Sequence, residues 1–278
     1  MGRTDMHMTD DGSIGQIGNG LRDCVYGAAI GDALGVPYEF KIRGLFRCKG
    51  MVEGGTHGQP AGTWSDDTAL MLATCDSIRV TGRIDIDDMR RRFTDWYRHG
   101  AYTPDGAVFD VGGTTARALD SGIGGSDEMD NGNGSLMRIA PLAFCDATEE
   151  EVAAVSAITH AHETSTSACI RLVRMLRTLM RNPQGIMFKL RSTYAERTQW
   201  SVHSDGFVEH TLDAALWCLA STDGYADCVL RAVNLGHDTD TTACVAGTLA
   251  GVAYGFDAIP DEWVSGLRGK DILEKCLF

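Results

Sequence analysis

Apolar and polar positions along this 278-residue chain follow the spacing of helices, and the strict alternation typical of β-strands is nearly absent. Acidic starts, a Thr148-x-x-Glu151 capping box and glycine or Asn-Pro stops mark several of the segments. The pattern predicts helices at residues 22–36, 85–100, 151–162, 165–181, 211–220, 225–235 and 240–256. We therefore predict an all-α fold.

Long segments that contain glycine separate these helices, at residues 41–63, 100–113, 121–135 and 182–206. Compact helical domains usually have shorter connections, and longer loops are often functional. No domain boundary or repeat interrupts the chain, so we expect one compact domain over residues 21–278. Residues 1–20 are polar and rich in glycine, aspartate and methionine, which predicts a mobile N-terminal tail.

Two of the predicted helices carry glycine at every fourth position. The glycines are Gly27, Gly31 and Gly35 in the first helix, and Gly247, Gly251 and Gly255 in the second. Without side chains there, each helix has a smooth face against which another backbone can pack closely. We expect tight core packing at these faces.

Two helix starts are alike, TWSDDT at 63–68 and GHDTDT at 236–241, and an apolar run follows each. Capping explains one such start, because Ser and Asp accept hydrogen bonds from the first turn. Each start, however, has two carboxylates where capping needs one. If the four carboxylates converge, they require cations, and all-oxygen ligands suit Mg²⁺ or Mn²⁺. Adjacent Asp66 and Asp67 must point in different directions, which suits two ions in one cluster.

The charge balance and the cysteines narrow the class of protein. The 25 basic and 38 acidic residues give a net charge of -13, which excludes a non-specific binder of nucleic acid or anionic membranes. A phosphate-containing ligand stays possible, because metal ions supply local positive charge. The nine cysteines form no CxxC pair and read as reduced core thiols. With no signal peptide or membrane span in the pattern, we expect a cytoplasmic protein and a monomer.

Taken together, several motifs resemble the ADP-ribosylglycohydrolase family. They run in family order from about residue 21 to 255 and read GAAIGDALGVPYEF (27–40), GTWSDDTAL (62–70), FDVGGTTARAL (109–119), NGNGSLMRIAPLAF (131–144), ITHAHE (158–163) and NLGHDTDTTACVAGTLAGVAYG (234–255). The resemblance implies an all-α fold with a central cleft that holds two Mg²⁺ or Mn²⁺ ions.

The resemblance also implies the metal ligands, which are Ser65, Asp66, Asp67, Asp238, Asp240 and Thr241. Ser65 stands where many members have Thr, and the ligating hydroxyl is kept. His237 stands where Gly is frequent and Glu163 where Pro is frequent, and both departures concern the substrate rather than the metals.

Two glycine-bearing loops resemble those that approach the diphosphate and adenosine in this family, and they contain Gly112, Gly113, Asn133, Gly134 and Ser135. Glycines let backbone N–H groups come close to phosphate oxygens, although a plain turn is the alternative for either loop. By resemblance His160 contacts the phosphate or the distal ribose. The alternative is that His160 only stabilises the C-terminus of a helix.

Asp110 and Glu39 are the candidate acid/base carboxylates. The resemblance implies a hydrolase that removes ADP-ribose from a modified acceptor, with arginine-linked ADP-ribose on a protein as the leading substrate and a small molecule as another. Two alternatives are a non-catalytic regulator that binds ADP-ribose and a metal-dependent phosphohydrolase of another nucleotide.

Overall fold

The computed structural model describes residues 14–278, and these residues form helices and loops with no β-strand. The predicted all-α fold is confirmed. The α-helices are α1 (Ile14–Gly35), α2 (Asp66–Thr81), α3 (Ile86–His99), α4 (Gly113–Ser121), α5 (Glu149–Ser156), α6 (Glu163–Arg181), α7 (Pro183–Thr193), α8 (Val208–Ala220), α9 (Tyr225–Val233), α10 (Thr239–Tyr254), α11 (Asp261–Gly266) and α12 (Lys270–Cys276).

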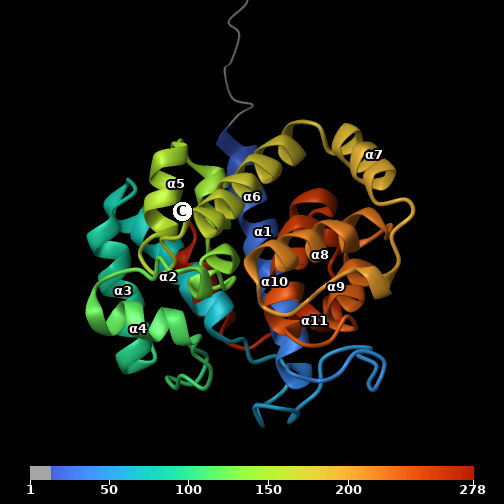
Figure 1. Cartoon of the computed structure of the whole chain (residues 1–278), viewed down its shortest axis with the longest axis horizontal. Helices are drawn as coiled ribbons and strands as arrows, with labels where there is room; N and C mark the ends of the chain where they lie inside the picture. Colours follow the sequence, from blue (N-terminus) through green and yellow to red (C-terminus); the bar gives the residue numbers. More distant parts are fainter. Residues whose placement is uncertain (1–13) are drawn as a thin grey trace, which may run out of the picture.

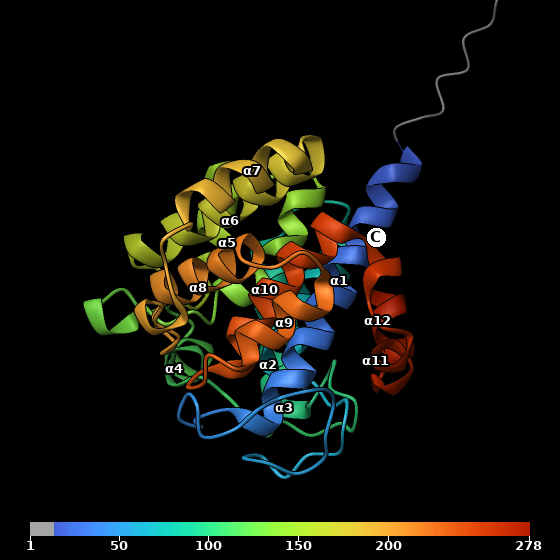
Figure 2. The same ribbon diagram turned by 90° about the vertical axis from the view of Figure 1, so that its right-hand side faces the viewer.

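Helices α1 and α10 lie side by side through the middle of the molecule (Figures 1 and 2). Their backbones touch where the glycines stand. A Cβ on Gly27 would lie 2.3 Å from the carbonyl oxygen of Gly247, and a Cβ on Gly31 would lie 2.1 Å from that of Ala243. The close packing that the glycine spacing predicts is therefore confirmed.

The other long helices surround this central pair. Helices α8 and α9 pack on α10, α2 packs on α1 and α3, and α5 packs on α6. The buried apolar side chains of these helices form one continuous core. Figure 2 shows α11 and α12 beside α1, and the long loop 41–63 at one end of the molecule. No helix in the described part of the chain is long and apolar enough to cross a membrane.

Most helix ends follow the local signals in the sequence. Helix α3 begins after Asp85, whose side chain accepts a hydrogen bond from Asp88 N, and ends at the left-handed Gly100. The Thr148–Glu151 capping box starts α5, and α6 ends immediately before Asn182.

Three expected boundaries were wrong. Pro183 does not continue a loop to residue 206 but begins α7, because Pro is favoured in a first helical turn and Asn182 caps it. Helix α5 ends at Ser156 rather than near residue 162. Helix α1 begins at Ile14, so residues 14–20 of the expected tail are helical, and residues 1–13 lie outside the described residues.

We predict that Gly27→Ala destabilises the protein, although Ala is favoured over Gly in an ordinary helix by about 1 kcal/mol. The new methyl group would meet backbone atoms of Gly247 and Gly251, which no rotamer change moves away. We expect a loss of about 3 kcal/mol in the free energy of unfolding, measured by urea denaturation. Gly224→Ala is the control, because a Cβ there meets no atom within 4 Å. Equal stability of the two variants would contradict the close approach.

Candidate metal centre

The starts of α2 and α10 meet in space, although they are far apart in the sequence. Ser65 caps α2, and its hydroxyl donates to Asp67 Oδ2 at 2.8 Å. The hydroxyl of Thr241 lies 3.4 Å from the same oxygen, across 174 residues of sequence. Asp238 is the cap residue of α10, and Asp240 lies in its first turn. The structure therefore brings the predicted ligands of the two helix starts together.

Asp32, which the sequence analysis did not single out, joins this group from α1. Its carboxylate accepts hydrogen bonds from the backbone N of Ser65 at 2.9 Å and of Thr68 at 3.1 Å, and from the Thr68 hydroxyl at 2.6 Å. Burial raises the pKa of Asp32 to about 6. Oxygens of Asp32, Asp67 and Asp240 lie within 4.8 Å of one another. The sequence did contain a signal for Asp32, because it is an aspartate that stands among the glycines of a helix expected to be buried.

Both candidate acid/base carboxylates lie at the same place. Ligand atoms of Glu39, His57, Asp110 and Asp240 all lie within 4.8 Å of one another. Glu39 is buried, and its Oε2 is hydrogen-bonded to His57 Nε2. The His57 ring lies 5.3 Å from that of Phe109, measured between centroids. His57 was missed, because it stands in a loop with no periodic pattern around it.

The predicted ligands form a buried group in which several carboxylate oxygens lack a hydrogen-bond donor. Asp67 Oδ1, Asp238 Oδ1 and Asp240 Oδ2 are buried and accept no hydrogen bond from the described residues. Burial first, and neighbouring carboxylates second, raise the pKa of Asp66, Asp67 and Asp240 well above the ordinary value.

The same two causes raise the pKa of Glu39 to about 9. Burying unpaired carboxylates costs several kcal/mol for each ion, and divalent cations remove that cost. The unpartnered oxygens and the all-oxygen donor set of the two helix starts therefore fit Mg²⁺ or Mn²⁺. We name this group, which comprises Asp32, Glu39, Asp66, Asp67, Asp110, Asp238 and Asp240, the acid cluster.

The predicted loop residues border the acid cluster in different ways. The Asn133 amide donates to Asp238 Oδ2 at 2.8 Å. Gly134 lies between His160 and Thr115, where a Cβ would be 2.8 Å from the imidazole. The Ser135 hydroxyl instead points into the core, where Ser156 donates to it at 2.9 Å.

Gly112 and Gly113 are exposed at the start of α4, the position at which backbone N–H groups are free of helical partners. Of the loop residues, these two present the most open backbone.

His160 is buried and lies four residues beyond Ser156, the last residue of α5, so its side chain is not in the last turn of that helix. A guanidinium nitrogen of Arg138 donates to the Thr159 hydroxyl at 2.8 Å, and that oxygen lies 2.8 Å from His160 Nδ1. Because Arg138 only donates and no other acceptor for the hydroxyl is found among the described residues, Thr159 donates to Nδ1. The proton of His160 is therefore on Nε2.

Burial, followed by the charge of Arg138, lowers the pKa of His160 to about 3. His160 is accordingly a neutral imidazole at physiological pH, with its N–H donor on Nε2. Nε2 lies beside the glycine loop, 3.5 Å from where a Cβ on Gly132 would stand.

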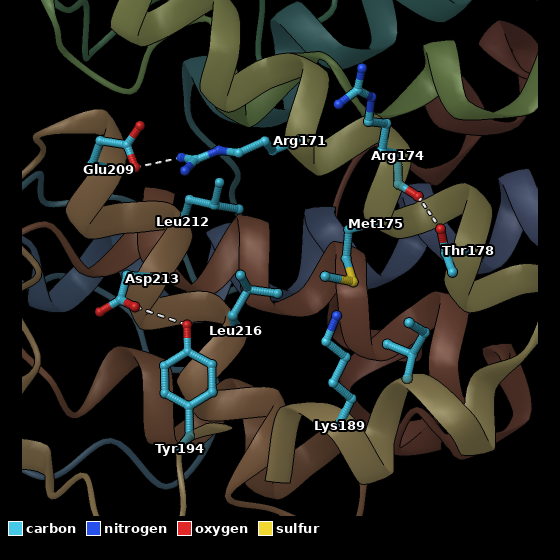
Figure 3. Close-up of a pocket in the computed structure, with 11 residues that line it drawn as sticks. Arg171, Arg174, Met175, Thr178, Lys189, Tyr194, Glu209, Leu212, Asp213 and Leu216 are labelled. Carbon is cyan, nitrogen blue, oxygen red and sulfur yellow. Dashed lines mark hydrogen bonds and ion pairs between the residues drawn. The ribbon is translucent and has the colours of Figure 1, made fainter. Parts of the chain in front are cut away.

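A pocket of about 450 Å³ lies between α6, α7 and α8, away from this chemistry (Figure 3). Its floor is apolar, with Met175, Leu212 and Leu216, and its rim carries the hydrogen bond from Tyr194 to Asp213. None of the candidate site residues lines it.

Comparison with known proteins agrees with the fold. A sequence model of the ADP-ribosylglycohydrolase family matches residues 17–277. The chain belongs to this metal-dependent family, and it is an enzyme that removes ADP-ribose by hydrolysis. The resemblance carried by the sequence motifs is thereby confirmed.

Individual relatives align over most of the chain. An ADP-ribosylarginine hydrolase, Tri1, of Serratia proteamaculans (strain 568) is 31% identical, and the alignment covers 88% of this chain and 74% of that protein. The ADP-ribosyl-[dinitrogen reductase] glycohydrolase of Rhodospirillum rubrum is 30% identical over 88% of each. A solved structure described as an ADP-ribosylglycohydrolase-related protein complex has a TM-score of 0.78 at 29% identity, covering 95% of this chain and 97% of that chain.

We predict that Asp67→Asn and Asp240→Asn lose Mg²⁺ and Mn²⁺ affinity while remaining folded, because each removes charge from the acid cluster. Calorimetric titration measures the binding. Asp87→Asn is the matched control, since Asp87 is an exposed acid in the first turn of α3. Undiminished binding in both cluster variants would count against the assignment.

The acid cluster also predicts how stability depends on pH. The carboxyl groups of the cluster have raised pKa values in the folded state, so the folded protein holds more protons than the unfolded chain. The free energy of unfolding therefore falls as pH rises. For Glu39 this window runs from its ordinary value of 4.5 up to about 9. The metal-free protein should therefore melt at a higher temperature at pH 6 than at pH 8, and Asp240→Asn should reduce the difference.

Proposed function

We propose that this protein hydrolyses the bond between C1 of the distal ribose of ADP-ribose and an arginine side chain of a modified protein. The acid cluster carries the proposal, because its buried, unpartnered oxygens form a site that needs cations. The names of the two relatives support the acceptor, since one acts on ADP-ribosylarginine and the other on ADP-ribosyl-[dinitrogen reductase].

Two divalent cations, Mg²⁺ or Mn²⁺, would be held by Ser65, Asp66, Asp67, Asp238, Asp240 and Thr241. When bound, the ions supply Lewis acidity and an anchor for the distal ribose hydroxyls. The Asn133 amide orients Asp238 through its 2.8 Å hydrogen bond. Asp32 fixes the start of α2, so that Asp66 and Asp67 are held on a rigid backbone.

Asp110 and Glu39 handle the proton. Asp110 is the less buried of the two, and it accepts the proton of the water that attacks C1. Glu39 is its rival for the same task, held in position by the hydrogen bond with His57. The C1–N bond breaks, and the leaving guanidino nitrogen takes up a proton. A positioned carboxylate contributes about 10²–10⁴-fold to such a step.

The diphosphate lies along the loops that carry Gly112, Gly113 and Asn133–Ser135. Gly134 leaves room beside the His160 ring that a side chain would fill. His160 contributes its Nε2–H as a neutral donor. Backbone N–H groups at the start of α4 add donors on the other side.

The surface beside the acid cluster supports a protein acceptor rather than a small molecule. Four large apolar residues of two neighbouring loops are exposed there, namely Phe40, Ile42, Leu45 and Trp200. Arg43 ties the two loops together by donating to the carbonyl oxygens of Gln199 and, at 2.8 Å, Val202. Exposed apolar patches of this kind are typical of protein-binding surfaces.

We predict free ADP-ribose as the product when arginine-linked ADP-ribose on protein is supplied with Mg²⁺ or Mn²⁺, and no product with EDTA. A panel of defined acceptors, carrying the linkage through Arg, Ser, a nucleobase or a phosphate, is followed by mass spectrometry. Faster release from a different acceptor would overturn the arginine assignment. Unchanged ligand would indicate a regulator that only binds ADP-ribose, and release of AMP would indicate a phosphohydrolase.

We predict that Asp110→Asn lowers kcat by at least about 10²-fold while KM and metal affinity change little. Asn keeps the size of the side chain but cannot accept the proton. Glu39→Gln is the parallel variant. The base is the carboxylate whose substitution lowers kcat and leaves KM unchanged. Should neither variant slow turnover by even about tenfold, roughly 1.4 kcal/mol of barrier, a protein carboxylate is not the base.

A further inference from the structure

The loop that leads from α7 into α8 carries a second group of metal-ligating side chains, outside the acid cluster. His203 and Asp205 are exposed on this loop, and the residues between and before them, Ser204 and Val202, are buried. This alternation turns His203 and Asp205 to the same outer side. His210, in the first turn of α8, completes the group.

The three side chains converge closely. One ligand atom from each lies within 4.8 Å of the other two. The His203 and His210 rings are stacked, with centroids 4.8 Å apart and an angle of 25° between planes. His210 Nδ1 lies 2.7 Å from Asp205 Oδ1. Asp205 is fixed further, since the backbone N of Phe207 donates to the same oxygen at 3.4 Å.

We propose that His203, Asp205 and His210 bind a borderline cation such as Zn²⁺, as a second metal site separate from the acid cluster. Two imidazoles and one carboxylate are the donors that Zn²⁺ favours, whereas Mg²⁺ prefers a set made of oxygens alone. With three protein ligands, a tetrahedral ion keeps one position open to water or an anion.

The backbone of this loop connects the second site to the acid cluster. The carbonyl oxygen of Ser204 accepts from Asp238 N at 3.0 Å, and that of Gly206 accepts from Asn133 N at 3.0 Å. A cation held by His203, Asp205 and His210 joins the loop to the start of α8. It therefore stabilises the segment on which the backbones of Asp238 and Asn133 rest.

The simpler interpretation is an exposed ion pair between His210 and Asp205 that binds no metal. The chain contains such a pair elsewhere, because His99 and Asp95 on α3 are exposed and their Nδ1 and Oδ1 atoms lie 2.8 Å apart. That pair is in none of the groups of three potential metal ligands found among the described residues. This pair has one imidazole and one carboxylate but no second imidazole nearby, so a substitution of His99 is the matched control.

The test is calorimetric titration of the full chain with Zn²⁺ in excess Mg²⁺, supported by the visible absorption of Co²⁺, which reports nitrogen ligands. The wild type should bind Zn²⁺, and His203→Ala and His210→Ala should each weaken the affinity by at least about tenfold. His99→Ala should leave the affinity unchanged. All three residues are surface-accessible, so circular dichroism should show unchanged folding.

Zn²⁺ also has a route into the acid cluster, where His57 provides an imidazole. His57→Ala should retain the Zn²⁺ binding that His203→Ala loses. The reverse result would overturn the proposal, as would equal binding by the wild type and His203→Ala.

In excess Mg²⁺, added Zn²⁺ should raise the melting temperature of the wild type and leave that of His203→Ala unchanged. An equal rise in both proteins would contradict the proposal that the cation stabilises the loop. None of these readouts depends on which acceptor the enzyme uses.

Discussion

The contact between the backbones of α1 and α10 sets the relative position of Asp32 and Asp240, two members of the acid cluster. At Gly35 the approach is so close that a Cβ would lie 2.3 Å from Asp240 Cα. The Thr239 hydroxyl donates to the Gly35 carbonyl oxygen at 2.8 Å and fixes the register at this end. Since backbone atoms cannot rotate out of a contact, the two helices have one register. In that register the carboxylates of Asp32 and Asp240 are neighbours.

This arrangement buries several carboxylates close together, which destabilises the folded chain when no cation is bound. Some of the charge is compensated locally, because Asp32 accepts N–H groups at the start of α2, and the positive ends of two helix dipoles point at the acid cluster. The unpartnered oxygens of Asp67, Asp238 and Asp240 are not compensated in this way. Divalent cations bound there would therefore stabilise the folded protein.

The sequence was sufficient to predict the all-α class, the glycine contact and the meeting of two acidic helix starts, because each depends on a local pattern or a repeated motif. It was insufficient for Asp32 and His57. Asp32 acts through hydrogen bonds to Ser65 and Thr68 that only the tertiary fold creates. His57 lies in a loop whose path is set by contacts to other segments, such as the hydrogen bond from Thr56 N to the Pro37 carbonyl oxygen.

Helix α7 was missed for a related reason. The Asn182-Pro183 pair ends one helix and begins the next, and the two roles use the same residue types. Sequence spacing alone does not distinguish a stop from a stop followed by a start. The family resemblance placed Ser135 in a ligand-binding loop, whereas its hydroxyl points to Ser156 in the core.

The charge of the chain constrains how an anionic ligand enters. With a net charge of -13, the protein repels a diphosphate at long range. The groups that border the proposed diphosphate path are backbone N–H groups of the glycine loops and the Nε2–H of His160, which are neutral, together with the exposed Arg117 guanidinium beside Gly113, which is paired with Asp130. Neutral donors orient phosphate oxygens but do not cancel their charge. Under the proposed assignment, cations in the acid cluster supply most of the attraction, so metal binding and ligand binding would be coupled, and each would strengthen the other by the same factor. Because His160 stays neutral through the physiological pH range, this coupling depends on the carboxylates and their cations rather than on a histidine.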